Sequence, residues 1–176
     1  MNIINENKTV GLLAEIVALK RGYAPVKAQQ IRIAAALHDI DKSAIDNRIL
    51  DSPNKLTPEE FQIVKTHTAI GAGILADIQG ELGYVAQMTA LYHHENESGT
   101  GYWRVPARYL PEYISIVSIC DVFIALITSN RPYKDAWLIH DALAYIQAQA
   151  GTVFNAELTK LFVSLIQNDS RIANIF

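Results

Sequence analysis

Apolar residues recur along this chain with the three- and four-residue spacing of amphipathic helices. The first run consists of Val10, Leu13, Ala14, Val17 and Ala18. Gly22 ends this run, and Pro25 opens a second segment that continues to Leu37. The two-residue alternation that is typical of half-buried strands does not persist over any useful length. The pattern therefore predicts an all-α fold.

Later segments follow the same period. Thr57 and Pro58 form a strong helix start, because threonine can cap a first turn and proline fits the first helical position. That helix is expected to end near Leu75. Residues 40–56 and 95–108 are polar and read as loops. Further helices are expected over about 81–94, from Pro111 through an apolar run to Leu126, over 134–149 and over 155–167.

Length and composition suit one compact domain over residues 1–176, built as a single bundle of about six to seven helices around one core. Half of the residues are hydrophobic, and the net charge of -3 argues against a general binder of DNA or RNA duplexes. Cys120 is the single cysteine, in an apolar setting that favours a buried thiol. No signal pattern and no membrane-length apolar run is present, so a cytoplasmic location is expected.

Four of the five histidines occur in three short groups: His38 beside Asp39, His67 alone, and the pair His93 and His94. A lone histidine on an apolar face is usually a core or surface residue. Adjacent His93 and His94 would point about 100° apart on a helix, so they cannot share one packing role. Near a helix end, however, both can reach one ion. The groups together therefore indicate metal ligands.

Asp121 lies within the most apolar predicted helix. An unpaired carboxylate there would cost several kcal/mol, so it needs an ion pair, a capping role or a metal. Metal ligation explains it better, and mixed imidazole and carboxylate ligands suit iron, manganese, zinc or nickel. Two such ions about 3.5–4 Å apart would generate hydroxide from a bridging water at neutral pH. Phosphoester hydrolysis is the reaction class that this ligand set favours.

Eight strings, in order and with suitable spacing over about residues 6–165, resemble the HD-GYP domain. They are LHDIDK (37–42), KLTPEE (55–60), KTHT (65–68), HHE (93–95), GTGY (99–102), DVFIAL (121–126), SNRPYK (129–134) and GTVF (151–154). The resemblance implies a helical HD-type fold with a central metal site. It also implies a phosphodiesterase that hydrolyses the bacterial second messenger cyclic di-GMP to pGpG or GMP through a metal-bridging hydroxide.

The resemblance also assigns roles to residues. His38 and Asp121 would hold the first metal, Asp39 would bridge, and the second metal would be held by His67, His93 and His94. Lys42 would act with Asp39 at the reacting phosphate or bridging water. Arg131 and Lys134 would clamp substrate phosphates, and Tyr102 would pack against the ligand.

The sequence departs from the family pattern at several positions. Glu6 occupies the place of a further histidine ligand of the first metal, and Asn2 replaces the glutamate of three-metal members. Two divalent ions are therefore expected, with Glu6 as an oxygen ligand and iron or manganese preferred over zinc or nickel. Asp41 replaces a glycine, and the GYP tripeptide is Gly101-Tyr102-Trp103.

These departures leave two alternatives to cyclic di-GMP hydrolysis. The chain could be an HD phosphohydrolase for another nucleotide. It could also be a degenerate module that binds metal or nucleotide without turnover and signals through protein partners, with the exposed aromatic residues Tyr102, Trp103 and Tyr109 as a contact surface.

Overall fold

The structure, a computed structural model, describes residues 3–41, 45–50, 54–128, 136–169 and 172. Within these residues the regular structure is helical, apart from one isolated bridge between Ala150 and Phe154. The prediction of an all-α fold is confirmed. The α-helices are α1 (Ile3–Arg21), α2 (Pro25–Leu37), α3 (Asn47–Leu50), α4 (Pro58–Ile74), α5 (Gly80–Tyr92), α6 (Glu112–Ile127), α7 (Ile139–Ala148) and α8 (Ala156–Asn168). Two 3-10 helices, η2 (Leu75–Asp77) and η3 (Ala107–Tyr109), complete the described elements.

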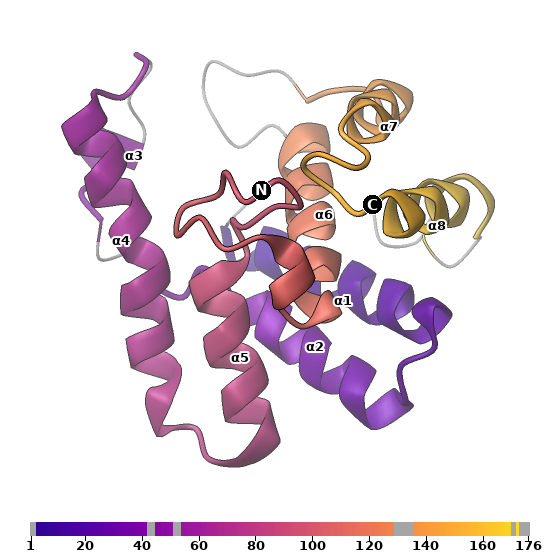
Figure 1. The fold of residues 1–176 in the computed structure, drawn as a ribbon, viewed down its shortest axis with the longest axis horizontal. Coiled ribbons are helices and arrows are strands. Elements are labelled where there is room, and N and C mark those ends of the chain that lie inside the picture. Colours follow the sequence, from indigo (N-terminus) through magenta and orange to yellow (C-terminus); the bar gives the residue numbers. More distant parts are fainter. Residues whose placement is uncertain (1–2, 42–44, 51–53, 129–135, 170–171, 173–176) are drawn as a thin grey trace.

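Helix α6 runs through the middle of the bundle (Figure 1). It buries ten of its sixteen residues, more than any other described helix. Helix α1 packs against both α2 and α6, and α5 packs between α2 and α4. Helices α7 and α8 lie on the side of α6 opposite α4 (Figure 1). In the core, the rings of Phe123 on α6 and Phe162 on α8 meet edge to face at 5.3 Å.

The expected helix starts and ends have local causes. Thr57 and Glu60 form a reciprocal capping box at the start of α4. Gly22 follows α1 with a φ of 102°, a conformation that favours glycine. Helix α5 ends at Tyr92, two residues before its expected end. As a result, the two histidines that follow it lie on the turn that leaves the helix.

One predicted boundary was wrong. The segment expected to become helical at 134 forms α7 only from Ile139 onward, and the described residues before it are not helical. The backbone N–H of Trp137 donates instead to the carbonyl of Leu126, near the end of α6. The N–H of Trp137 is thus used in a tertiary contact, and Leu138, the residue before α7, is extended.

Cys120 is a free and fully buried thiol, as expected. None of the described helices combines the length and apolar character that crossing a bilayer requires.

Candidate metal centre

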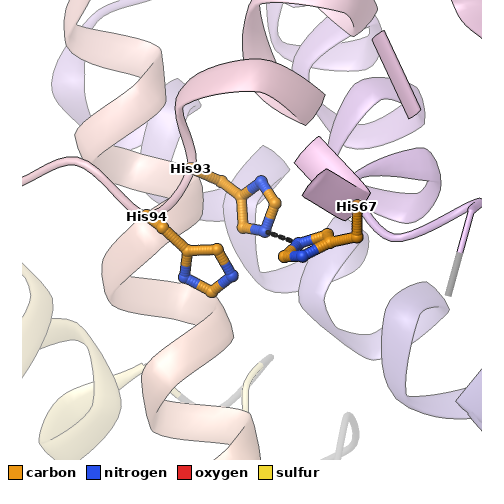
Figure 2. Close-up of side chains that lie close together, drawn as sticks. All are labelled: His67, His93 and His94. Atoms are coloured by element: carbon orange, nitrogen blue, oxygen red, sulfur yellow. Dashed lines mark hydrogen bonds between the residues drawn. The ribbon is translucent and has the colours of Figure 1, made fainter. Parts of the chain in front are cut away.

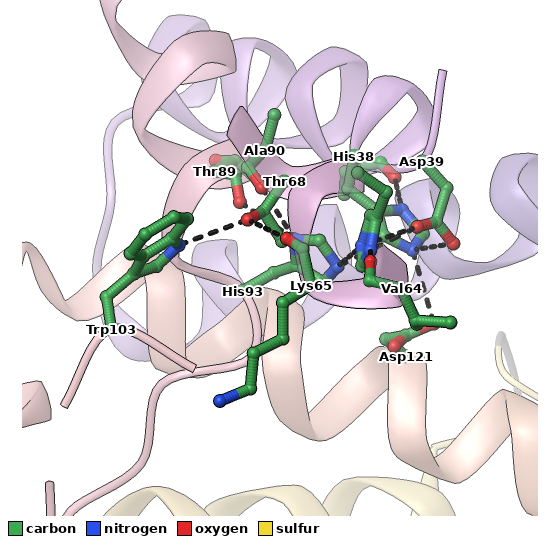
Figure 3. Close-up of polar contacts among 12 residues, drawn as sticks. His38, Asp39, Val64, Lys65, Thr68, Thr89, Ala90, His93, Trp103 and Asp121 are labelled. Atoms are coloured by element: carbon green, nitrogen blue, oxygen red, sulfur yellow. Dashed lines mark hydrogen bonds and ion pairs between the residues drawn. The ribbon is translucent and has the colours of Figure 1, made fainter. Parts of the chain in front are cut away.

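Four elements bring the candidate ligands together where the C-terminal end of α2 meets α4, α5 and α6. Figure 2 shows three histidine rings converging from α4 and from the turn after α5, and Figure 3 shows the polar contacts around them. His38 and Asp39 directly follow α2, His67 lies on α4, His93 and His94 follow α5, and Asp121 lies on α6. All but His94 and Asp121 are buried, and the side chain of Asp121 is 23% exposed.

Three of the histidines are tied to their own helices through Nδ1. The Nδ1–H groups donate from His38 to the Ala35 carbonyl (2.6 Å), from His67 to the Val64 carbonyl (2.6 Å) and from His93 to the Ala90 carbonyl (3.0 Å). A carbonyl can only accept, so each Nδ1 carries the hydrogen. Each Nε2 is therefore the atom turned to the centre of the cluster, which is the usual arrangement of a metal-binding histidine.

The carboxylate of Asp39 faces two sets of imidazole nitrogens. Its Oδ2 lies 2.9 Å from Nε2 of His38. Its Oδ1 lies 3.4 Å from Nε2 of His67 and 3.7 Å from Nε2 of His93. Asp121 approaches from α6, with Oδ1 3.3 Å from Nε2 of His38. One carboxylate oxygen of Asp39 thus faces His38, and the other faces His67 and His93.

The ligand atoms form two overlapping groups that could each hold an ion. One consists of His67, His93 and His94, and the other of His38, Asp39 and His93, with the ligand atoms of each group within 4.8 Å of one another. Such mixed nitrogen and oxygen donors suit a divalent metal. Asp121 lies beside the second group, with its Oδ1 in contact with Nε2 of His38.

Electrostatics divide the histidines into two kinds. Burial lowers the pKa of His94 to about 4 and holds the pKa of His93 well below its usual range, so both rings are neutral and can offer a lone pair. Burial also opposes the charged form of His38, but Asp39 and Asp121 outweigh it and raise the pKa of His38 well above its usual range. Against the effect of burial, His38 in turn holds the pKa of Asp121 at about 2. A positive charge is thus favoured between these carboxylates.

Other predicted site residues are placed less directly. Glu6, on α1, accepts a hydrogen bond of 2.5 Å from the hydroxyl of Thr128, at the end of α6, and belongs to neither group of ligand atoms. Asp41 is buried, with Oδ1 2.9 Å from where a side chain on Gly71 would begin. Asn2, Lys42, Arg131 and Lys134 lie outside the described residues.

The loop after α5 closes over the histidines. The ring of Tyr102 lies 4.3 Å from that of His94, centroid to centroid. The buried carboxylate of Glu95 accepts from the backbone N–H groups of Trp103 and Val105, at 2.7 Å each. The Trp103 indole donates to the hydroxyl of Thr68 on α4 (3.0 Å; Figure 3).

Glu95 is part of the HHE string, but no role for its side chain was predicted from the sequence. Its direct adjacency to the histidine pair was the available signal, but its two partners lie eight and ten residues further along the chain.

Comparison with known proteins gives a consistent result. A sequence model described as HD domain matches residues 2–158. The chain is 37% identical over 166 residues to a cyclic di-GMP phosphodiesterase of Thermotoga maritima, covering 94% of this chain and 45% of that protein. It is 40% identical over 144 residues to the cyclic di-GMP phosphodiesterase response regulator RpfG of Xanthomonas campestris, covering 81% and 38%. The chain thus spans less than half the length of these relatives.

Among solved structures, the fold resembles that of Bd1817, an HDGYP protein of Bdellovibrio bacteriovorus. The TM-score is 0.75 with 20% identity, and the match covers 95% of this chain and 53% of that one. At this identity the likeness concerns the fold alone.

Proposed function

Because the chain belongs to the HD domain family, we propose that it is a metal-dependent phosphodiesterase that hydrolyses cyclic di-GMP to pGpG or GMP. The observation that carries the proposal is the position of the Asp39 carboxylate. Its Oδ2 faces His38, and its Oδ1 faces His67 and His93. The similarity to relatives named cyclic di-GMP phosphodiesterases supports the choice of substrate.

We assign two divalent ions, with iron or manganese preferred, to the two ligand groups. His67, His93 and His94 would hold one ion, His38 and Asp121 the other, and Asp39 both. When bound, such ions activate water and stabilise charge on a phosphodiester. To bind an ion, Glu6 would first have to break its hydrogen bond with Thr128.

The protein's own groups have simple tasks in this scheme. The backbone carbonyls hold the imidazoles of His38, His67 and His93 with Nε2 inward, so few rotamers need to be ordered on binding. Burial excludes bulk water from Asp39, which strengthens its electrostatic interactions. In hydrolysis, water adds to phosphorus, the ester P–O bond breaks and the leaving ribose oxygen takes up a proton. We propose that Lys42 assists Asp39 there, and that Arg131 and Lys134 bind substrate phosphates.

The test measures metal content and cyclic di-GMP turnover on the same anaerobically purified sample. We expect about two ions per chain, as a binuclear site requires, together with linear product. Asp39→Asn should lose both turnover and part of the metal. Asp141→Asn is the matched control, because Asp141 also lies 3.3 Å from a histidine, His140, but on the exposed surface of α7.

Other outcomes would contradict the proposal in different ways. Bound metal with rapid cleavage of a different phosphoester and none of cyclic di-GMP would identify another HD phosphohydrolase. Tight metal or nucleotide binding with no turnover in iron or manganese would indicate a signalling module that acts through protein partners.

A further inference from the structure

A cation and two aromatic rings lie beside the proposed metal ligands. Phe61 and Lys65 are one turn apart on α4, and Tyr102 comes from the loop after α5. The rings of Phe61 and Tyr102 meet edge to face at 5.6 Å. The Lys65 ammonium lies over both, 4.9 Å from the Phe61 centroid and 5.6 Å from the Tyr102 centroid. We call these three residues the aromatic rim.

The aromatic rim adjoins the histidines directly. Tyr102 is the link, with its ring centroid 4.3 Å from that of His94 and 6.0 Å from that of His67. In Figure 3 the side chain of Lys65 extends away from the hydrogen-bonded cluster, with its ammonium group apart from the contacts drawn. A ligand held at the histidines would therefore have the rim as its neighbour.

The exposed ring of Phe61 and the charge of Lys65 leave the aromatic rim able to bind a ligand. Phe61 is 40% exposed, although an aromatic ring gains most from burial. Among the described ion pairs, none includes Lys65, whereas Lys27 and Lys160 each contact a glutamate at 2.8 and 2.7 Å. An ammonium that takes part in none of these ion pairs retains its capacity for an anion.

We propose that the aromatic rim binds the outer part of a nucleotide, with a purine base stacked on the exposed Phe61 ring and a phosphate at Lys65. The inference rests on the proposed function and extends it. A cyclic dinucleotide carries two bases and two phosphates, so metal ions that hold one phosphodiester leave the other groups without partners. Aromatic rings stack on bases, and a lysine ammonium is a point charge for phosphate.

Hydrogen bonds hold the loop that carries Tyr102 in place. Glu95 fixes the backbone on both sides of residue 104, and the Trp103 indole ties the same stretch to Thr68 on α4. Tyr102 is thereby held opposite Phe61. Binding to such a preorganised surface costs little conformational entropy.

The test compares binding of guanosine monophosphate and of ribose 5-phosphate by calorimetry, in the presence of manganese. Phe61→Leu keeps the apolar bulk and removes the ring. It should raise the Kd for guanosine monophosphate by about tenfold and leave the Kd for ribose 5-phosphate unchanged. Ile63→Leu is the matched control, because Ile63 is similarly exposed on the same helix.

Lys65→Met keeps the aliphatic stem and removes the charge. It should weaken binding of both ligands by about three- to tenfold and reduce the dependence of affinity on salt. Lys160→Met makes the same change of charge on α8 and should do neither.

The proposal is overturned if Phe61→Leu affects both ligands equally or neither, or if the unaltered protein binds guanosine monophosphate no more tightly than ribose 5-phosphate. Turnover of cyclic di-GMP, assayed separately, distinguishes the two proposals. Ring-dependent binding without turnover would keep the rim and reject the phosphodiesterase. Turnover with ring-independent binding would keep the phosphodiesterase and reject the rim.

Discussion

The imidazoles of His67 and His93 turn their Nε2 atoms toward each other at a distance of 3.4 Å. Each ring uses its Nδ1–H on a backbone carbonyl, so these two Nε2 atoms present lone pairs to each other when both rings are neutral. Two acceptors at this distance repel. A cation between them would replace this repulsion with two favourable contacts, so the folded protein should gain stability from metal.

We therefore expect manganese to raise the melting temperature of protein that has first been treated with a chelator. At a metal concentration a hundred times the Kd, the gain is about 2.7 kcal/mol, or roughly 5–10 °C for a chain of this length. Circular dichroism with and without metal measures the shift. His67→Gln should reduce it, and His140→Gln, at an exposed position on α7, should not. An equal shift in both variants would argue against this cluster as the binding site.

The carboxylate of Glu95 offers a second test. Glu95→Gln would place an amide NH₂ against one of the two backbone N–H groups that the carboxylate now accepts. We expect a loss of about 1–3 kcal/mol of unfolding free energy and a change in Trp103 fluorescence, since the indole loses its fixed place beside Thr68. Urea unfolding and emission spectra provide both measurements. Glu97→Gln, two residues along the same loop, is the control and should change neither.

Tyr113 should be replaceable by phenylalanine at little or no cost. Its hydroxyl is buried and has no hydrogen-bond partner among the described residues. Removing an unsatisfied buried hydroxyl should leave the free energy of unfolding unchanged or raise it by up to about 1 kcal/mol. Chemical denaturation at pH 7 measures the difference, and a loss of more than about 1 kcal/mol would reveal a partner for this hydroxyl.

The same substitution should alter the response to alkali. Burial, with a smaller contribution from Tyr84, raises the pKa of Tyr113 above its usual range. Above about pH 10 the unfolded chain loses this proton while the folded protein keeps it, so stability falls as pH rises. Tyr113→Phe should remove up to about 1.4 kcal/mol per pH unit from that slope. Tyr109→Phe, at a position 72% exposed, should leave the slope unchanged.

Two helical glycines should respond in opposite directions to alanine. A Cβ at Gly83 would lie 1.7 Å from the carbonyl oxygen of Ile78, so Gly83→Ala requires the backbone before α5 to move. We expect a loss of about 2 kcal/mol or more. Gly73, on α4, has open space around it, and Gly73→Ala should add about 0.5–1 kcal/mol through the helix propensity of alanine. Equal effects at the two positions in thermal unfolding would contradict this account.

The sequence predicted the helices best where local chemistry alone sets their limits. Thr57 with Glu60 and Gly22 are complete signals within a few residues of chain, and the structure has the helix boundaries there. The start of α7 was wrong because its cause is not local. The hydrogen bond from Trp137 to Leu126 depends on how the chain returns to α6, which no window of sequence contains.

For the candidate site, the sequence identified residue types that the fold then brings together, from His38 to Asp121. It could not predict that Asp121 keeps 23% exposure in so apolar a helix, because that depends on which side of α6 faces the other helices. The sequence also did not predict that the aromatic rim lies beside the histidines. Phe61 and Lys65 have the spacing of ordinary surface residues, and their contact with Tyr102 exists only once the loop has closed.

The ligands come from four separate elements, so the complete site forms only when these elements have packed together. His38 and Asp121 meet only after α2 and α6, distant in sequence, have docked, so this part of the site depends on a long-range contact. Individual helices or hairpins made during synthesis therefore lack the full set of ligands. Metal binding would therefore show that the native topology has formed. The bound ion would act mainly by slowing unfolding.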